Sequence, residues 1–190
     1  PTIGPWLTTP GAEVAVEDGR ERARSILTRL GIAIPSALVG PSRERRVTRT
    51  DRARVVAPMA SFADAVCAAL GLRRIDPPIA GDVDAVAARL ATEPGAFVAW
   101  GEPTLTVPPD HGEGGRAQQL ALALAAHLRG TTRSALVVGS DGVDGPPPRA
   151  RPSPAGAFVD GATWDAIGAA GIDPVRALER RDAGTALLAI

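Results

Sequence analysis

Lysine and tyrosine are absent from this 190-residue sequence, and all 21 basic residues are arginines. A chain without lysine cannot supply a Schiff-base lysine, a lysine general base or the lysine of a Walker-type phosphate loop. The single cysteine, Cys67, excludes an internal disulfide. One cysteine and two histidines also cannot build a typical structural zinc site. The chemistry of this chain therefore depends on arginines, carboxylates and backbone groups.

Net charge and long apolar runs are lacking as well. The 21 basic residues are balanced by 21 acidic ones, so nothing in the charge favours nucleic acid or an anionic membrane. No apolar run reaches about 18 residues, and no basic-then-hydrophobic leader opens the chain. We therefore expect a cytoplasmic protein with no nucleic-acid partner and no membrane partner.

The residues that are present favour a folded α/β domain. Hydrophobic residues make up 45% of the chain and charged residues 22%, which is typical of a globular protein. Alanine and valine dominate while aromatics are scarce, as in sheets whose parallel strands are buried. The alternation of strand and helix patterns predicts a three-layer αβα fold with a mixed, mostly parallel sheet. We expect one domain over 1–190, with an entry segment at 1–17 and a proline-rich loop at 141–156.

Capping residues and apolar spacing set the expected elements. Helices are predicted where a cap precedes an apolar stripe and a glycine follows it. Strands are predicted where apolar residues alternate or form short runs. The predicted helices cover 18–30, 61–70, 82–93 and 115–128, with two short helices in 161–182. The predicted strands cover 45–59, 72–76, 96–100, 104–107 and 134–140.

The first candidate site is the glycine-rich stretch HGEGGRAQQ at 111–119. Gly114 and Gly115 allow backbone N–H groups to approach a ligand closely, and a helix N-terminus attracts anions. Arg116 adds a planar donor for phosphate or carboxylate, and its charge is unfavourable in a first helical turn unless an anion is near. The alternative is an ordinary glycine turn with an arginine facing solvent.

Two further candidates involve carboxylates. Asp141 and Asp144 follow the strand at 134–140, at the end where open α/β sheets bind ligands. They suit Mg²⁺ or a substrate hydroxyl, although Asp-Gly pairs are also common in plain turns. Glu102 follows the strand at 96–100. It either shares a cleft with Arg116 or forms a structural salt bridge with it.

Several motifs in a fixed order resemble the MOFRL domain of class II glycerate kinases, a family also described as hydroxypyruvate reductases. These motifs are GEPTLTV at 101–107, GEGGRAQQLALALA at 112–125, GSDGVDG at 139–145 and AGAFVD at 155–160. RARSILTRLGIAIP at 22–35 and ATWDAIGAAGIDPVRALERRD at 162–182 are similar to further family segments. The resemblance runs nearly from end to end. It identifies the chain as the second part of a two-domain kinase that lacks its N-terminal Rossmann-like domain.

The resemblance implies a kinase that transfers the γ-phosphoryl group of ATP to D-glycerate, giving 2-phosphoglycerate, with Mg²⁺. Arg116 would be the catalytic residue, acting on the transferred phosphate or on the substrate carboxylate. Glu102, Gly114, Gly115, Gln119, Asp141 and Asp144 would bind substrate or phosphate, and the two aspartates would also hold Mg²⁺. The partners would be a small hydroxy acid and the missing N-terminal domain, and a homodimer is compatible with the sequence. The isolated chain would be inactive.

Some residues depart from the family pattern. Ala117 and Gln119 replace an asparagine and a glutamate, and Arg181 replaces an asparagine. Trp100 and Pro103 stand where glycine and threonine are usual. These changes leave two alternatives open. One is a non-catalytic domain that binds an anion or nucleotide and regulates a partner; the other is part of an NAD(P)H-dependent hydroxypyruvate reductase.

Overall fold

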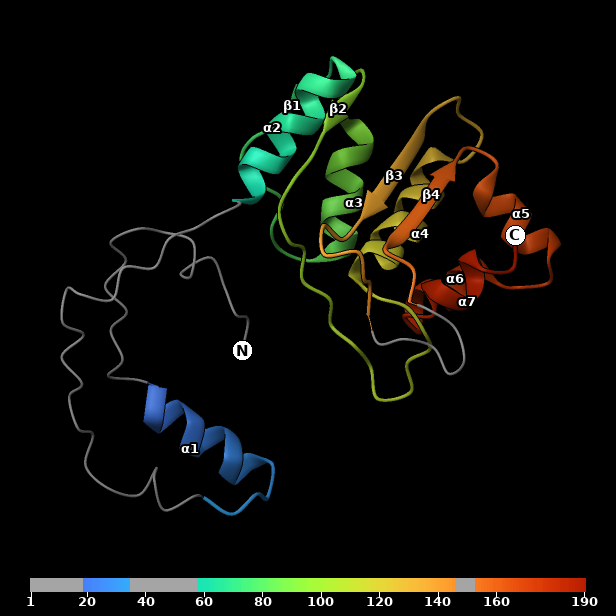
Figure 1. The fold of residues 1–190 in the computed structure, drawn as a ribbon. Coiled ribbons are helices and arrows are strands. Elements are labelled where there is room, and N and C mark those ends of the chain that lie inside the picture. The colour runs from blue at the N-terminus through green and yellow to red at the C-terminus, as the bar shows by residue number, and fades with distance from the viewer. Residues whose placement is uncertain (1–18, 35–57, 146–152) are drawn as a thin grey trace. The chain divides into compact units, whose positions relative to one another are not determined.

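The computed structural model describes residues 19–34, 58–145 and 153–190 (Figure 1). The chain divides into two compact units, 1–58 and 59–190, each taken here by itself. The first contributes helix α1 (Gly19–Arg29), which ends before Gly31 at a φ of +66°, as its sequence predicts. The entry segment 1–17 lies outside the described residues, as does the strand predicted at 45–59 apart from its last two positions.

The second unit contains all the other elements. Along the chain they are α2 (Met59–Leu70), β1 (Arg73–Arg74), α3 (Val83–Thr92), β2 (Phe97–Val98), α4 (Arg116–Leu128), β3 (Ser134–Val138), β4 (Gly156–Asp160), α5 (Thr163–Ala169), α6 (Pro174–Glu179) and α7 (Ala183–Leu187).

Most of these elements match the predicted ones. Helix α3 lies within the predicted range 82–93 and begins after Asp82, whose side chain caps it by accepting a hydrogen bond from the backbone N–H of Asp84. Helix α2 begins at Met59, so Ser61 lies inside the helix and is not its cap. The strand predicted at 104–107 is wrong, because only Thr104 makes an isolated bridge, to Asp82. Strand β4 and helix α7 were not predicted.

The strands form two separate pairs. Strands β1 and β2 are parallel, and β3 and β4 are antiparallel with Leu136 opposite Phe158. The α/β class is confirmed, but a three-layer arrangement with a mostly parallel sheet is not. The reason is that β4 pairs with β3 in the antiparallel sense, and the parallel pair β1–β2 has only two residues in each strand.

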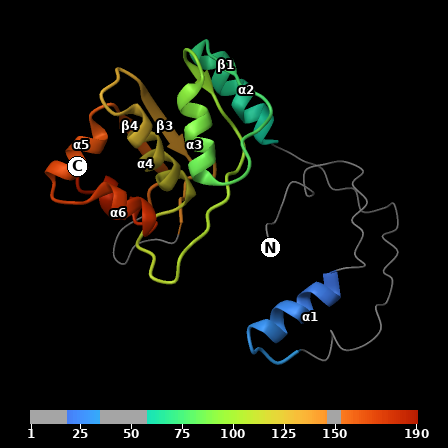
Figure 2. The same cartoon turned by 180° about the vertical axis from the view of Figure 1, so that it is seen from behind.

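Helix α4 is the centre of the second unit. Its residues from Ala117 to Ala125 are all buried, and it packs between α3 and the β3–β4 pair (Figures 1 and 2). Leu122 of α4 is fully buried, and so are Val159 of β4 and Ile167 of α5, which pack against α4 residues. A helix that is buried on all sides fixes the position of the loop that precedes it.

The outer face of the β3–β4 pair is uncovered within this unit. Leu136 and Phe158, which lie opposite each other on it, are 68% and 61% exposed, while Val159 on the other face is buried against α4. Among the residues that the structure describes, helices of this unit therefore pack on only one face of this pair. In the described ranges, no helix is long and apolar enough to cross a membrane.

Candidate functional site

The glycine loop at 112–115 is held by the C-terminal segment of the chain. The N–H of Gly112 donates to the carbonyl of Arg180, and the N–H of Glu113 donates to the Asp182 carboxylate, both at 2.8 Å. The N–H of Gly184 donates to the carbonyl of Glu113, also at 2.8 Å. A Cβ on Gly112 would lie 2.0 Å from the Asp182 side chain. The glycines therefore serve close packing of two chain segments, which is the role of a structural turn.

Asp144 caps helix α4 from a distant part of the chain. One carboxylate oxygen accepts the N–H of Ala117 at 2.9 Å, and the other accepts the N–H of Gln118 at 2.7 Å. The N-cap position itself is Gly115, which has no side chain to do this. A Cβ on Gly115 would lie 2.3 Å from a carboxylate oxygen of Asp144. Gly115 thus makes room for the carboxylate that completes the helix, and Asp144 occupies the position predicted for a ligand's anion.

Arg116 and Glu102 form an ion pair at the N-terminus of α4. Arg116 is the first residue of the helix, and Glu102 lies four residues beyond β2, where its N–H donates to the carbonyl of Ile79 at 3.0 Å. Both side chains are about half exposed, at 48% and 50%. The two residues do lie together, as both interpretations of the sequence require. The arginine's charge is balanced by a group that solvent can reach.

Asp141 and Asp144 have different surroundings. Asp141 is exposed and accepts the N–H of Val143 at 3.2 Å, which is a local turn contact. Asp144 is only 7% exposed, and each of its carboxylate oxygens already accepts one α4 amide. Within the described parts of the chain, no group of three or more histidine, cysteine or acidic residues could hold a metal ion. An exposed carboxylate such as Asp141 suits a water-rich Mg²⁺ site, and the Mg²⁺ role of both aspartates stays a prediction.

Gln119 contacts helix α6. Its side chain is buried, and its amide nitrogen donates to the carbonyl of Leu178 in α6 at 3.1 Å. The amide oxygen is buried and has no hydrogen-bond partner in the described part of the chain. Contact with substrate stays a prediction for this residue. In the structure it joins α4 to α6.

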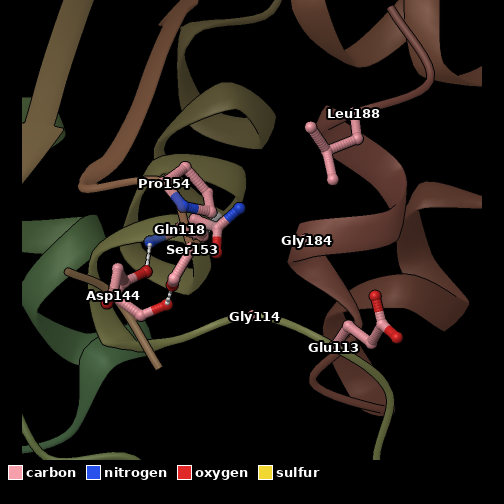
Figure 3. A pocket seen from close by; sticks show the side chains of 8 residues that line it. All are labelled: Glu113, Gly114, Gln118, Asp144, Ser153, Pro154, Gly184 and Leu188. Atoms are coloured by element: carbon pink, nitrogen blue, oxygen red, sulfur yellow. Dashed lines mark hydrogen bonds between the residues drawn. The ribbon is translucent and has the colours of Figure 1, made fainter. Parts of the chain in front are cut away.

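A small hollow lies beside the loop (Figure 3). Two predicted residues, Gly114 and Asp144, contribute to it, and Gln118 and Ser153 do so as well. The hydroxyl of Ser153 donates to the carbonyl of Asp144 at 3.0 Å and fixes that segment (Figure 3). Glu113, Pro154, Gly184 and Leu188 complete the lining. Ser153 could not be predicted, because the proline-rich segment around it has a biased composition but no motif that singles out one residue. Asp182 could not be predicted either, because the C-terminal motif does not indicate which distant residue it contacts.

Trp100, one of the departures from the family pattern, belongs to a polar cluster beside Glu102. Its indole N–H donates to Asp76 at 3.1 Å, and the guanidinium of Arg74 lies 5.3 Å from its ring centre. Arg74 also pairs with Asp64 at 2.7 Å and with Asp76 at 3.0 Å. The bulky side chain is therefore fixed, and it stiffens the segment that carries Glu102.

One titration shift is found at the end of the β3–β4 pair where β3 begins, which is the end away from Asp141 and Asp144. The N–H of Ala162, with further help from the Thr163 hydroxyl and N–H, lowers the pKa of Asp160 because these donors favour the charged carboxylate. Asp160 ends β4 and starts the turn into α5. Its role is to join these two elements.

Comparison with known proteins gives a consistent result. The model of the MOFRL family matches residues 95–190. A D-glycerate 2-kinase from Thermotoga maritima is 38% identical over 96 residues, which are 50% of this chain and 22% of that relative. The crystal structure of a glycerate kinase from the same organism aligns with a TM-score of 0.60 at 24% identity, over 90% of this chain and 45% of its own.

A second solved structure supports the same fold. A protein from Pyrococcus horikoshii OT3 aligns with a TM-score of 0.60 at 20% identity, again over 90% of this chain and 45% of its own. The chain thus spans less than half the length of each protein that it matches. At these identities the two solved structures show a shared fold. Neither they nor the family model assigns a role to an individual residue.

Proposed function

Because the chain belongs to the MOFRL family, we propose that it is the substrate- and phosphate-side part of a longer glycerate 2-kinase-like enzyme. That enzyme uses ATP and converts D-glycerate to 2-phosphoglycerate. The observation that carries the proposal is the position of Arg116, which is half exposed at the first turn of the central helix. The named activity of the Thermotoga maritima relative supports the substrate class.

Phosphoryl transfer relies on positioning and charge stabilisation more than on covalent chemistry of the protein. A substrate hydroxyl oxygen forms a bond to the γ-phosphorus as the bond to the β–γ bridging oxygen breaks, ADP leaves and the hydroxyl proton is lost to solvent. Arg116 offers paired N–H donors to the equatorial oxygens, where negative charge spreads. Mg²⁺ would neutralise phosphate charge when bound, and Asp141 is an exposed carboxylate that could help to hold it.

Asp144 and the glycines support this chemistry indirectly. By capping α4, Asp144 fixes the direction in which Arg116 leaves the helix. Gly114 and Gly115 allow the loop to pack against the segments at 144–145 and 184. A displacement of about 1 Å can cost a hundredfold in rate, so this packing is part of the catalytic design.

The experiment is a steady-state assay of the longer protein with ATP and D-glycerate. Arg116→Ala should lower kcat/KM by about 100-fold or more, because a charged donor to the transferring group is lost. Arg116→Lys is the control: it keeps the charge without the paired donors and should restore only part of the rate. An unchanged kcat/KM in Arg116→Ala would remove the arginine from the mechanism. The 190-residue chain alone should show no turnover.

A second candidate is a non-catalytic domain that binds an anion and regulates a partner. The observation that favours it is Gln119, which replaces the family's glutamate and is buried with its amide nitrogen bonded to the carbonyl of Leu178 in α6. Stabilisation of the longer protein by phosphate, without any turnover of ATP and D-glycerate, would support this candidate over the kinase.

A further inference from the structure

Two carboxylates bind the N–H donors at the start of α4. One is held rigidly by its surroundings, and the other is free to move at its side chain. Asp144 binds the helix amides of Ala117 and Gln118. Glu102 binds the guanidinium of Arg116. Each therefore occupies a position that an anionic ligand could take. The question is which of the two a ligand can replace.

Asp144 is fixed on every side. It is 7% exposed, and its own N–H donates to the carbonyl of Pro154 at 2.9 Å. Its carbonyl accepts the hydroxyl of Ser153 at 3.0 Å. The next residue, Gly145, lies so close to the loop that a Cβ on it would be 2.6 Å from the carbonyl of Gly114. Removing this carboxylate from α4 would require the whole segment to move.

Glu102 is fixed only through its backbone. Its N–H is bonded to Ile79, while its side chain is half exposed and contacts Arg116, which is half exposed too. Ion pairs of this kind contribute little net free energy in water. Exposed side chains also change rotamer within nanoseconds. Glu102 can therefore leave Arg116 without any change in the fold.

We propose that Glu102 is a displaceable counter-ion of Arg116, so that an anion binds this chain by replacing Glu102 while Asp144 keeps the amides of α4 occupied. The proposal rests on the proposed function, since it concerns the same arginine. It means that the ligand contacts a side-chain guanidinium. The N-terminal amides of the helix are not the binding site.

The exchange selects ligands by charge. Glu102 is a monoanionic carboxylate already tethered beside Arg116, so its effective concentration there is far above that of a free carboxylate. A free carboxylate that replaces it gains no additional charge. A phosphoryl group with two negative charges attracts Arg116 more strongly than the single charge of Glu102 does, and its oxygens match the paired donors of arginine. Arg116 is thus assigned to a phosphoryl group, and the substrate's carboxylate must be bound elsewhere.

The test is a titration of the full 190-residue chain with inorganic phosphate and, separately, with acetate. The Arg116 Nε–H resonance in ¹⁵N NMR spectra reports contact with the guanidinium directly. We expect phosphate to bind at least tenfold more tightly than acetate. Glu102→Gln should tighten phosphate binding about fivefold, because it removes the competing charge. Arg116→Gln should abolish binding.

Glu113→Gln is the matched control. It removes the same charge three residues from Arg116 on the exposed loop, and its carboxylate points away from the Asp144 side of the hollow (Figure 3). It should change phosphate affinity by less than twofold. An equal gain in Glu113→Gln would mean a general charge effect and would overturn the proposal. Unchanged or weaker phosphate binding in Glu102→Gln, or equal binding of acetate and phosphate, would overturn it as well.

These outcomes separate the proposal from the proposed function. If phosphate replaces Glu102 as expected but the longer protein does not turn over ATP with D-glycerate, the kinase function fails and the counter-ion role stands. If the longer protein is an active kinase but Glu102→Gln leaves phosphate binding unchanged, only the counter-ion role fails.

Discussion

Replacing Asp144 by alanine should destabilise the chain strongly, although Asp144 lies in a loop. The substitution removes the acceptor of two backbone N–H groups, from Ala117 at 2.9 Å and Gln118 at 2.7 Å. Both residues are buried, so water cannot easily replace the lost partner. Gly115 at the N-cap has no side chain that could take over.

The magnitude follows from these contacts. A hydrogen bond to a charged group contributes about 1.5–3 kcal/mol, and loss of a helix cap costs about 0.5–2 kcal/mol. Because the two bonds share one carboxylate, their energies do not simply add, and we expect a loss of about 2–4 kcal/mol. For a chain of this length, 3 kcal/mol corresponds to a fall in Tm of about 6–12 °C. That is a large part of the stability of an ordinary domain.

The assay is thermal unfolding followed by circular dichroism, with urea unfolding to check that the m-value is unchanged. Asp141→Ala is the matched control, since it removes an exposed aspartate whose contact is the N–H of Val143 at 3.2 Å. It should cost about 0.5 kcal/mol or less. If Asp144→Ala unfolds within 0.5 kcal/mol of the unmodified chain, or if the two variants are equally unstable, Asp144 is not the cap of α4.

Three further predictions concern packing, helix-end contacts and a carboxylate that stabilise the second unit. Gly115→Ala should cost about 2 kcal/mol or more, because its Cβ would lie 2.3 Å from the Asp144 carboxylate and 2.5 Å from its carbonyl carbon; Gly168→Ala, in α5 with no atom within 4 Å of the new Cβ, should be neutral or stabilising by up to about 1 kcal/mol in the same urea titration. Arg133→Ala should cost about 1–3 kcal/mol in urea unfolding, because Arg133 donates to the carbonyls of Ala91 and Glu93 at the end of α3; a loss equal to that of the exposed Arg89→Ala would contradict this. The lowered pKa of Asp160 means that its stabilisation is present above the carboxyl's unfolded pKa, near 4, and is lost as the pH falls through the lower folded pKa; Asp160→Asn should therefore flatten the fall in stability below about pH 4, and an unchanged pH profile would show that Asp160 does not contribute to it.

Local signals predicted the elements that depend on local structure. The helix at 82–93 with its apolar stripe and the glycine before α4 could be predicted, because these signals depend on neighbouring residues. The link between Glu102 and Arg116 was also foreseen, although its purpose was left open. The α/β class follows from the same patterns.

The remainder depends on contacts between distant parts of the chain. Strand β4 is short, and it pairs with β3 so that Phe158 lies opposite Leu136. Both apolar side chains are exposed. The strand therefore lacks the pattern of one buried apolar face that would have predicted it. The capping role of Asp144 involves residues 26 and 27 positions earlier in the chain. The one available hint was local: a glycine N-cap leaves helix amides without a partner, so some other segment must supply an acceptor.

The tie between the glycine loop and the C-terminal segment also sets an order of events during synthesis. Asp182, which accepts the N–H of Glu113, is translated 69 residues after it. While the ribosome still holds residues 180–184, the loop lacks the partners of Gly112 and Glu113, even if α3 and α4 have already formed outside the exit tunnel. The loop that precedes Arg116 therefore reaches its final arrangement only after residues 180–184 have left the exit tunnel. A nascent chain stalled before residue 180 would contain α4, but the loop at its N-terminus would lack the contacts with residues 180–184.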